Sequence, residues 1–507
     1  MSMATRARAV MVLGTTSGAG KSWLATALCR WYARQGLRVA PFKAQNMSNN
    51  ARVVPGPQGL PGEIGSAQYF QAVAARVRPD VRMNPVLLKP ESDTASQVVV
   101  MGQVRRDYGA MPWRERSEQL WPHARAALDE LMAEFDVVVI EGAGSPAEIN
   151  LQHCDFVNMR TALHVNAACL LVTDIDRGGA FAHLFGTHQL LPPDERRLIR
   201  GFVLNRFRGD ERLLAPGPEQ LQALTGVPTV AVIPMRRGHG LPEEDGLHDE
   251  AMAVEAPVDQ VLRVAVLAPP RISNLDEFQG LRQWPHVRLV WARQARDLID
   301  VDWVILPGSK HTTSDLAWLR AQGLDLAVLA HARQGRRVLG ICGGLQMLGE
   351  RILDPHGVES EVPDTTGLGL LALETTFDLD KTLQLTQTRF SDDLGPWQAL
   401  AGVAFDAYEI HHGRTTVSAH GADTQAVLLN EQGEALGWRQ GSVLGLYAHG
   451  LLEDPRVVQA LFGAQTRTLD EVMDGLADLI DARFSPGVLQ GLLHNSPDGC
   501  FQGRSHD

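Results

Sequence analysis

Cysteine is scarce in this sequence: the 507 residues include five, at positions 29, 154, 169, 342 and 500. They form no CxxC pair and their number is odd, so neither a disulfide framework nor a cysteine zinc site is expected. Sparse, unpaired cysteine is typical of a reducing compartment. We therefore predict a cytoplasmic protein whose cysteines are free thiols.

The sequence also lacks a basic excess and a long apolar run. Its formal net charge is −12 and its pI about 5.8, so it has no composition for the broad basic face of a general nucleic-acid binder. No run reaches the roughly 18 apolar residues of a membrane-spanning helix. The short apolar run at 9–14 is predicted as a strand rather than a targeting signal. We expect small-molecule partners, no nucleic acid and no membrane, and the oligomeric state stays open.

What the chain does contain is an alternation of short apolar runs and helical patterns. Apolar runs occur at 9–14, 37–42, 136–142, 168–174, 201–206 and 229–234, and again at 262–269, 287–293, 302–308, 336–342 and 442–450. Strands buried on both faces of a parallel sheet have this pattern. The length and the intervening helical segments predict an α/β protein with two doubly wound domains. The predicted organisation is a domain at 1–235, a linker at 236–260, a domain at 261–455 and a helical tail at 456–507.

The first predicted strand leads into a glycine loop and then a helix, the order of a phosphate-binding loop. The loop GTTSGAGKS is one residue longer than the standard G-x-x-x-x-G-K-[ST] spacing. Small residues, here Gly18 and Gly20, let backbone N–H groups converge on phosphate oxygens, and the helix N-terminus adds its dipole. We predict that Lys21 reaches the β- and γ-phosphates of ATP and that Ser22 binds Mg²⁺. The alternative is a glycine-rich turn with an accidental lysine.

Polar residues end other predicted strands, at the edge where open α/β sheets bind ligands. Glu141 ends the run DVVVIE and is the predicted acidic ligand of Mg²⁺; a solvated strand-end carboxylate is the alternative. Asn205 ends a later strand and is predicted to bind the nucleotide base. The segment TDIDRGG adds Asp174, Asp176 and Arg177 at the same edge.

The second predicted strand runs into PFKAQNMSNN, a dense set of hydrogen-bonding side chains. We predict substrate contacts from Lys43, Gln45, Asn46 and Asn50, joined by Lys89 from a later loop. Basic and amide groups together suit a large substrate that is rich in carboxylates. The alternative is a polar loop without a ligand, because asparagine and serine are common turn formers.

The segment GICGG has the form of a nucleophile elbow, a sharp strand-to-helix turn with glycines around the nucleophile. It presents Cys342 at a helix N-terminus, where a thiolate is favoured. We predict oxyanion donors in the backbone N–H groups of Gly343 and of Gly308, and a general base in His449, at the end of a later strand. A buried structural cysteine is the alternative. Three other histidines are alternative bases: His311, His411 and His412.

Taken together, these motifs resemble known families. An LPGS loop, a cysteine elbow and a later YAHG, in this order, resemble a class I glutamine amidotransferase domain, which implies a flavodoxin-like fold. The lengthened phosphate loop resembles the dethiobiotin-synthetase-like ATPases, which implies a P-loop NTPase-type parallel sheet. Both halves, with FKAQNMSNN and MNPVLLKP, resemble the cobyric acid synthase family over nearly the whole chain.

This resemblance implies a two-site amidoligase of cobalamin biosynthesis. Cys342 would release ammonia from glutamine through a thioester, with His449 as base and acid. ATP and Mg²⁺ would convert the b, d, e and g carboxylates of adenosylcobyrinic acid a,c-diamide to acyl phosphates, which ammonia turns into amides. Class I domains carry H-x-E at the histidine, whereas this chain has Leu451 there and Glu453 two residues later. What orients His449 is therefore open.

Two rival functions stay open at this point. Cobyrinate a,c-diamide synthases and similar amidoligases have the same two sites, but those synthases carry aspartates where this chain has Met47 and Asn50. A P-loop switch of the partitioning-ATPase type would bind a partner rather than form a product, and it leaves Cys342 without a role.

Overall fold

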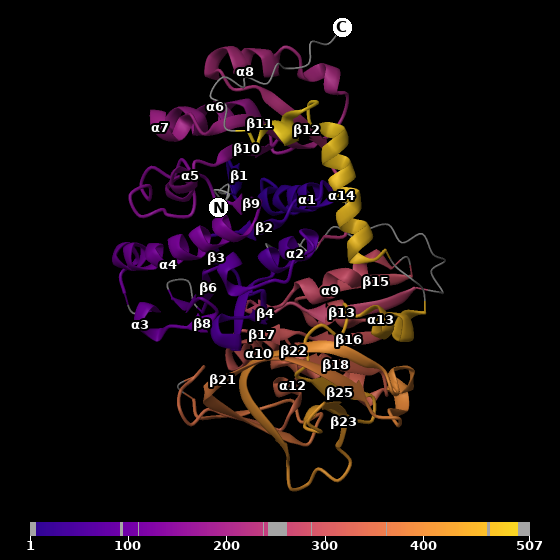
Figure 1. Ribbon diagram of the computed structural model, residues 1–507. Helices are drawn as coiled ribbons and strands as arrows, with labels where there is room; N and C mark the ends of the chain where they lie inside the picture. Colours follow the sequence, from indigo (N-terminus) through magenta and orange to yellow (C-terminus); the bar gives the residue numbers. More distant parts are fainter. Residues whose placement is uncertain are drawn as a thin grey trace.

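The computed structural model describes residues 7–91, 95–109, 111–236, 238–241, 261–284, 286–360, 362–463 and 467–494. Most of the predicted linker, residues 242–260, lies outside this described part. Figure 1 shows two α/β domains stacked end to end, the N-terminal one from indigo to magenta and the C-terminal one from salmon to orange. Among the described helices, none combines the length and the hydropathy that crossing a membrane requires.

The N-terminal domain is built on a six-stranded parallel sheet with the order β12-β11-β10-β1-β9-β2. Its strands are β1 (Arg8–Gly14), β2 (Val39–Phe42), β9 (Val137–Glu141), β10 (Ala168–Asp174), β11 (Ile199–Phe207) and β12 (Thr229–Pro234). The six apolar runs of the N-terminal half form these strands because both faces of the sheet are buried. The chain leaves β1, between β9 and β10, at the switch point where such sheets bind ligands.

Helices cover both faces of this sheet. On one face, α4 (Trp113–Glu134), α5 (Met159–Val165) and α6 (Ala180–Leu190) pack against Met11 and Leu13. On the other face, α1 (Lys21–Arg34) and α14 (Leu469–Arg483) pack against Val10 and Val12. The remaining helices of the domain are α2 (Ser66–Ala74), α3 (Arg106–Gly109), α7 (Pro193–Arg196) and α8 (Gly217–Thr225).

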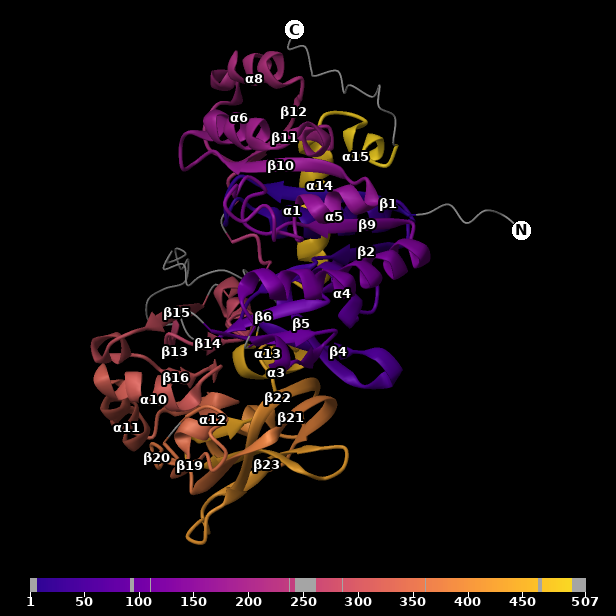
Figure 2. The ribbon, with the colours of Figure 1, turned by 90° about the vertical axis from the view of Figure 1, so that its left-hand side faces the viewer.

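Two small sheets lie between the main sheet and the C-terminal domain (Figure 2). One has the order β3-β6-β7-β8, from β3 (Gln45–Met47), β6 (Val86–Pro90), β7 (Ser96–Val100) and β8 (Gln103–Val104). The other pairs β4 (Ala51–Pro55) with β5 (Pro61–Gly65). The predicted substrate loop therefore continues into strands that face the second domain.

The C-terminal domain contains a mixed sheet of eleven strands in the described part of the chain. Five parallel strands form one side, in the order β15-β13-β16-β18-β25: β13 (Leu262–Leu267), β15 (Val287–Ala292), β16 (Trp303–Leu306), β18 (Arg337–Ile341) and β25 (Val443–Leu446). The others are β19 (Arg351–Leu353), β20 (Asp364–Thr366), β21 (Leu373–Phe390), β22 (Ala404–Val417), β23 (Gln425–Asn430) and β24 (Ala435–Gln440). The flanking helices are α9 (Asp276–Gln279), α10 (Thr312–Ala321), α11 (Leu324–Arg333) and α12 (Gly343–Leu348).

The segment predicted as a helical tail packs on both domains. In α13 (Pro455–Phe462), the ring of Phe462 lies against Trp284 and Trp303 of the C-terminal domain. The yellow helix α14 in Figure 1 then runs along the N-terminal domain, where Arg30 of α1 pairs with Asp474 at 2.8 Å. After it comes α15 (Val488–Gly491). The end of the described chain thus completes the helix layer of the first domain.

Candidate active site

The phosphate loop has the geometry that its sequence predicts. Gly18 and Gly20 have φ angles of 70° and 99°, which favour glycine because a side chain is strained there. Helix α1 begins at Lys21, whose Nζ donates to the carbonyl oxygens of Thr16 and Gly144, each at 3.1 Å. The ammonium group therefore lies over the loop and beside the chain that leaves β9.

Glu141, the last residue of β9, is the polar centre of this site. Its carboxylate accepts hydrogen bonds from Ser22 Oγ at 2.8 Å, Lys43 Nζ at 2.8 Å and Gln71 Nε2 at 2.6 Å. Burial alone would raise the pKa of Glu141, but Lys43 and the other two donors outweigh burial and lower the pKa below its ordinary value. The structure thus joins the predicted metal ligands to Lys43 and adds Gln71, which no sequence motif indicated.

The donor set at Glu141 fits Mg²⁺. A serine hydroxyl and a carboxylate are hard oxygen ligands, and Mg²⁺ is usually bound by one or two protein groups together with waters and phosphates. In the described ranges, no cluster of three or more histidine, cysteine or carboxylate side chains offers an all-protein metal cage. Ser22 and Glu141 therefore fit an ion that arrives with a nucleotide.

Asn205, at the end region of β11, contacts the phosphate loop. Its Nδ2 donates to the carbonyl oxygen of Ala19 at 2.9 Å. A side chain at position 20 would be strained because φ is 99° there, and a Cβ would also meet the same Nδ2 atom, which together favour glycine. Asn205 thus helps to hold the phosphate loop in place through its hydrogen bond to Ala19. Its contact with a nucleotide base stays a prediction.

The predicted substrate residues do not lie together in one place. Lys43 lies at the nucleotide site, whereas Gln45 and Asn46 lie in β3, next to β6. Lys89 of β6 pairs with Glu63 of β5 at 2.9 Å, and the same carboxylate binds Lys381 of the C-terminal domain at 2.7 Å.

Asn50 lies at the domain boundary, where its Oδ1 accepts from the backbone N–H of Leu275 at 2.8 Å. Direct substrate contacts from the loop residues and from Lys89 stay predictions.

The cysteine elbow is a strained turn between β18 and α12. Cys342 has φ 52° and ψ −107°, and its backbone N–H donates to the carbonyl oxygen of Leu446 in β25 at 2.8 Å. A Cβ on Gly344 would lie 2.0 Å from the carbonyl oxygen of Leu306, which explains the glycine there. A non-glycine residue held at positive φ is typical of a functional turn, so the structure supports Cys342 as a nucleophile.

The two glycines predicted as oxyanion donors border the same site. Gly308 lies in β17 (Gly308–Ser309), which pairs with β14 (Ile272–Ser273). A Cβ on Gly308 would lie 3.3 Å from Cε1 of His449, and a Cβ on Gly343 would lie 2.9 Å from the backbone nitrogen of Ser309. The cysteine elbow, the segment at Gly308 and the ring of His449 are therefore in contact range of one another. The role of the two N–H groups as oxyanion donors stays a prediction.

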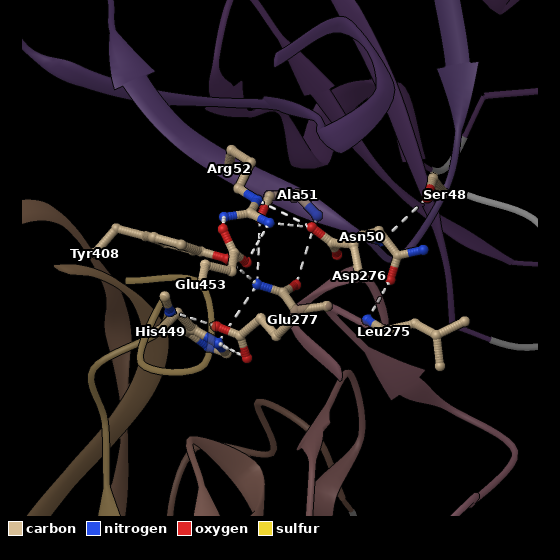
Figure 3. Close-up of polar contacts among 12 residues, drawn as sticks. Ser48, Asn50, Ala51, Arg52, Leu275, Asp276, Glu277, Tyr408, His449 and Glu453 are labelled. Carbon is tan, nitrogen blue, oxygen red and sulfur yellow. Dashed lines mark hydrogen bonds and ion pairs between the residues drawn. The ribbon is translucent and has the colours of Figure 1, made fainter. Parts of the chain in front are cut away.

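Figure 3 shows what orients His449. Nδ1 of the ring lies 3.1 Å from Oε2 of Glu277, and Oε1 of the same carboxylate accepts from the backbone N–H of Gly450 at 2.5 Å. Tyr408 stacks on the imidazole with 5.1 Å between ring centroids. The carboxylate comes from α9, 172 residues before the histidine in the chain. Cys342, His449 and Glu277 thus have the arrangement of a nucleophile, a base and an orienting acid.

The charge state of His449 follows from these neighbours. Burial alone would lower its pKa, but the carboxylate of Glu277 and the interaction with Cys342 outweigh burial and raise the pKa to about 10. With Nδ1 at Glu277, the other ring nitrogen is left for Cys342. A protonated imidazole held by a carboxylate is a group that can donate a proton to a leaving amine.

The alternative bases have other partners. His411 lies between Glu409 at 3.1 Å and the carbonyl oxygen of Gly413 at 2.9 Å. His412 contacts the carbonyl oxygen of Asp378, and burial lowers its pKa to about 4. His311 accepts from a backbone N–H as the N-cap of α10.

Glu453, the glutamate nearest to the expected H-x-E position, binds Arg52 at 2.6 Å instead of His449. Sequence reasoning did not find Glu277, because no motif surrounds it and its partner is distant in the chain.

Comparison with known proteins finds the same two parts. Two protein-family models match the chain. The model of the CobQ/CobB/MinD/ParA nucleotide binding domain matches residues 10–246, and the model of the CobB/CobQ-like glutamine amidotransferase domain matches residues 263–457. A cobyric acid synthase of Methylibium petroleiphilum is 67% identical over 498 residues, which cover 97% of this chain and 98% of that protein. A cobyric acid synthase of Leptothrix cholodnii is 68% identical over 498 residues, with coverages of 96% and 97%.

Proposed function

This chain belongs to the cobyric acid synthase family, and from that premise we propose that it amidates corrinoid carboxylates with ammonia from glutamine. The substrate is adenosylcobyrinic acid a,c-diamide and the amidated positions are b, d, e and g. The observation that carries the proposal is the Cys342–His449–Glu277 arrangement, which occurs in one chain with a phosphate loop. The first site supplies ammonia, and the second supplies a carboxylate with a leaving group.

At the glutaminase site, Cys342 attacks the side-chain amide carbon of glutamine. His449 gives its Nε2 proton to the departing ammonia and then takes a proton from the water that hydrolyses the glutamyl thioester. Glu277 keeps the proton on Nδ1 and stabilises the imidazolium. The N–H groups of Gly308 and Gly343 stabilise the oxyanion that forms in both steps.

At the synthetase site, the chain's own groups position ATP and neutralise charge. The phosphate loop and Lys21 bind the phosphates, while Ser22 and Glu141 hold Mg²⁺, which supplies further charge neutralisation when it is bound. Lys43, 2.8 Å from Glu141, faces the same region and orients the carboxylate that is phosphorylated. Ammonia then displaces phosphate from the acyl phosphate.

A cavity of about 990 Å³ lies between the domains, and its wall holds four cationic side chains (Arg105, Arg106, Lys310 and Lys381) together with four carboxylates (Glu91, Asp107, Glu359 and Asp380). Because these charges balance and neither Lys21 nor Glu141 lines the cavity, we do not assign it to the corrinoid. The four described cysteines are free thiols, which is consistent with a cytoplasmic location.

Counting the new amides by mass spectrometry tests the substrate. Purified protein receives ATP, Mg²⁺, glutamine and either adenosylcobyrinic acid a,c-diamide or a cobyrinic acid that lacks the two amides. We expect amidation of the a,c-diamide at four further positions, as the family assignment implies. Preferred formation of the a,c-diamide from cobyrinic acid would identify the rival synthase, and turnover of ATP without any amidated corrinoid would contradict the proposal.

A further inference from the structure

The strand β4 belongs to the N-terminal synthetase domain, but its residues contact residues beside the glutaminase site. It begins at Ala51, directly after the predicted substrate loop. Its second residue, Arg52, is buried although it is charged. Figure 3 shows this arginine above Asp276, with Glu277 and His449 lower in the view.

Arg52 binds two carboxylates of the C-terminal domain. Its Nε and Nη2 both donate to Asp276, the former at 3.1 Å, and its Nη1 and Nη2 donate to Glu453 at 2.8 and 2.6 Å. The guanidinium also lies 5.3 Å from the ring centroid of Tyr408 and 5.0 Å from that of Phe70. Such a planar fork between two carboxylates fixes direction as well as charge.

Consecutive synthetase residues hold consecutive residues of the glutaminase domain. The side chain of Asn274 donates to the carbonyl oxygen of Ala51 at 3.2 Å. The N–H of Leu275 donates to Asn50, and Asp276 binds Arg52. Asn274 has φ 54°, a conformation that costs free energy and persists only when its surroundings hold it.

The next residue after this anchored segment is Glu277, whose carboxylate contacts Nδ1 of His449. Because Asp276 and Glu277 are adjacent in the short helix α9, the contacts that hold the backbone at Asp276 also fix the point from which the Glu277 side chain extends. Loss of the Arg52 fork would leave Asp276 as a buried carboxylate without its cation, which would move or take a proton, and it would leave the partly exposed Glu453 unpaired.

We propose that Arg52 is a positioning residue of the glutaminase, which acts from the synthetase domain through Asp276 and Glu277 on His449. This inference rests on the proposed function, because it assigns His449 to glutamine hydrolysis. It means that the strand that follows the substrate loop also sets the geometry of the ammonia-producing site.

The charged and titratable groups near His449 all bear on the test. They come from α9, the β4 strand, β22, the elbow and the chain after His449: Asp276, Glu277, Arg52, Tyr408, Cys342 and Glu453.

The test uses the full chain with Arg52→Met, which removes the charge, and Arg52→Lys, which keeps the charge but not the fork. The matched control is Arg30→Met. Arg30 is also buried and pairs with two carboxylates, Asp470 and Asp474, but these lie on α14. Three quantities are measured: glutamine-supported amidation, ammonium-supported amidation, and the pH dependence of Cys342 alkylation by iodoacetamide, followed on its peptide by mass spectrometry.

We expect Arg52→Met to lower glutamine-supported turnover by about 100-fold, the cost of a misplaced catalytic group, while ammonium-supported turnover stays near that of the wild type. Alkylation of Cys342 should be slower than in the wild type across the pH range, because a misplaced His449 accepts the thiol proton less readily. Arg52→Lys should recover part of both losses, and Arg30→Met should show neither.

An alkylation profile for Arg52→Met that matches the wild type would overturn the inference, as would an equal loss of ammonium-supported turnover. If the wild type itself produced no amide from glutamine, the proposed function would fail, whatever Arg52 does.

Discussion

Replacing Glu277 by glutamine changes one contact of the glutaminase site and keeps its shape. Oε2 of Glu277 lies 3.1 Å from Nδ1 of His449, while Oε1 accepts from the N–H of Gly450. A glutamine can keep the acceptor for Gly450, but it then turns an N–H group towards Nδ1. The imidazole must carry its proton on Nε2, so it can no longer accept the proton of the Cys342 thiol.

The size of the effect follows from the role of the proton. General acid–base catalysis supplies about 10²–10⁴-fold, and the corresponding carboxylate-to-amide change in a Ser-His-Asp triad costs about 10⁴-fold. We expect glutamine-supported amidation by Glu277→Gln to fall by about 10³-fold, which corresponds to about 4 kcal/mol in the barrier. Ammonium-supported amidation should be unchanged, because it bypasses Cys342.

The pH dependence of stability offers a second readout for this variant. Glu277 and Cys342 raise the folded-state pKa of His449 from 6.5 to about 10, against the effect of burial. A raised pKa stabilises the fold fully below about pH 6.5, and this stabilisation is lost as the pH rises through about 10. Glu277→Gln should therefore weaken the decline in the free energy of unfolding between pH 7 and 10, measured by urea titration.

Glu409→Gln is the matched control, because Glu409 contacts the alternative base His411 at the same distance, 3.1 Å, although through Nε2 of its ring. The assay follows glutamate release and amide formation in parallel. Near wild-type glutamine use by Glu277→Gln, together with a large loss in Glu409→Gln, would refute the assignment of His449 and transfer the role to His411.

Three further substitutions separate the two sites and the contact between them. Cys342→Ala should abolish glutamine-supported amidation and keep the ammonium-supported reaction, measured with each nitrogen source; full turnover with glutamine would show that another residue is the nucleophile. Glu141→Gln should lower amidation from both sources by about 100-fold and raise the Mg²⁺ concentration required, with glutamate release as the retained activity; an unchanged Mg²⁺ dependence would contradict its role as a ligand. Glu63→Gln should destabilise the protein by about 3–5 kcal/mol, because it leaves the buried Lys89 and the partly buried Lys381 without their carboxylate, whereas Glu118→Gln removes an exposed pair and should cost about 0–1 kcal/mol. Despite burial, those lysines lower the pKa of Glu63 from 4.5 to about 2, so its stabilisation is present above pH 4.5 and is lost as the pH falls towards 2; equal effects of the two substitutions in urea titrations would contradict this account.

Local sequence patterns predicted those parts of the protein that local physics determines. The parallel strands were predictable because burial on both faces requires continuous apolar runs, as in β10 and β18. The phosphate loop and the elbow were predictable because their glycines and their nucleophile or lysine occupy adjacent positions. These features confirm the predicted fold class.

The antiparallel part of the second sheet was missed for a physical reason. The strand β21 has alternating buried and exposed residues at its end, as in LTQTRF, because only one face packs on the core. A search for continuous apolar runs does not detect such strands. The short strands β3, β4 and β5 were missed because their pairing depends on residues brought together by the tertiary fold.

The third member of the glutaminase site could not be predicted from local spacing. Glu277 lies 172 residues from His449, in a short helix with no distinguishing motif. The glutamate that spacing suggested, Glu453, pairs with Arg52 across the domain boundary. Long-range pairs of this kind depend on how the domains pack, which a single sequence does not specify.

The central claim is that ammonia made at Cys342 is consumed at the phosphate loop in one coupled reaction. The most direct measurement supplies wild-type protein with ATP, Mg²⁺, adenosylcobyrinic acid a,c-diamide and glutamine labelled with nitrogen-15 in its amide, and compares labelled corrinoid amides with ATP consumed. The account predicts one labelled amide for each ATP hydrolysed, and no labelled amide without ATP. Labelled amides that form without ATP, or ATP hydrolysis that yields no labelled amide, would contradict it.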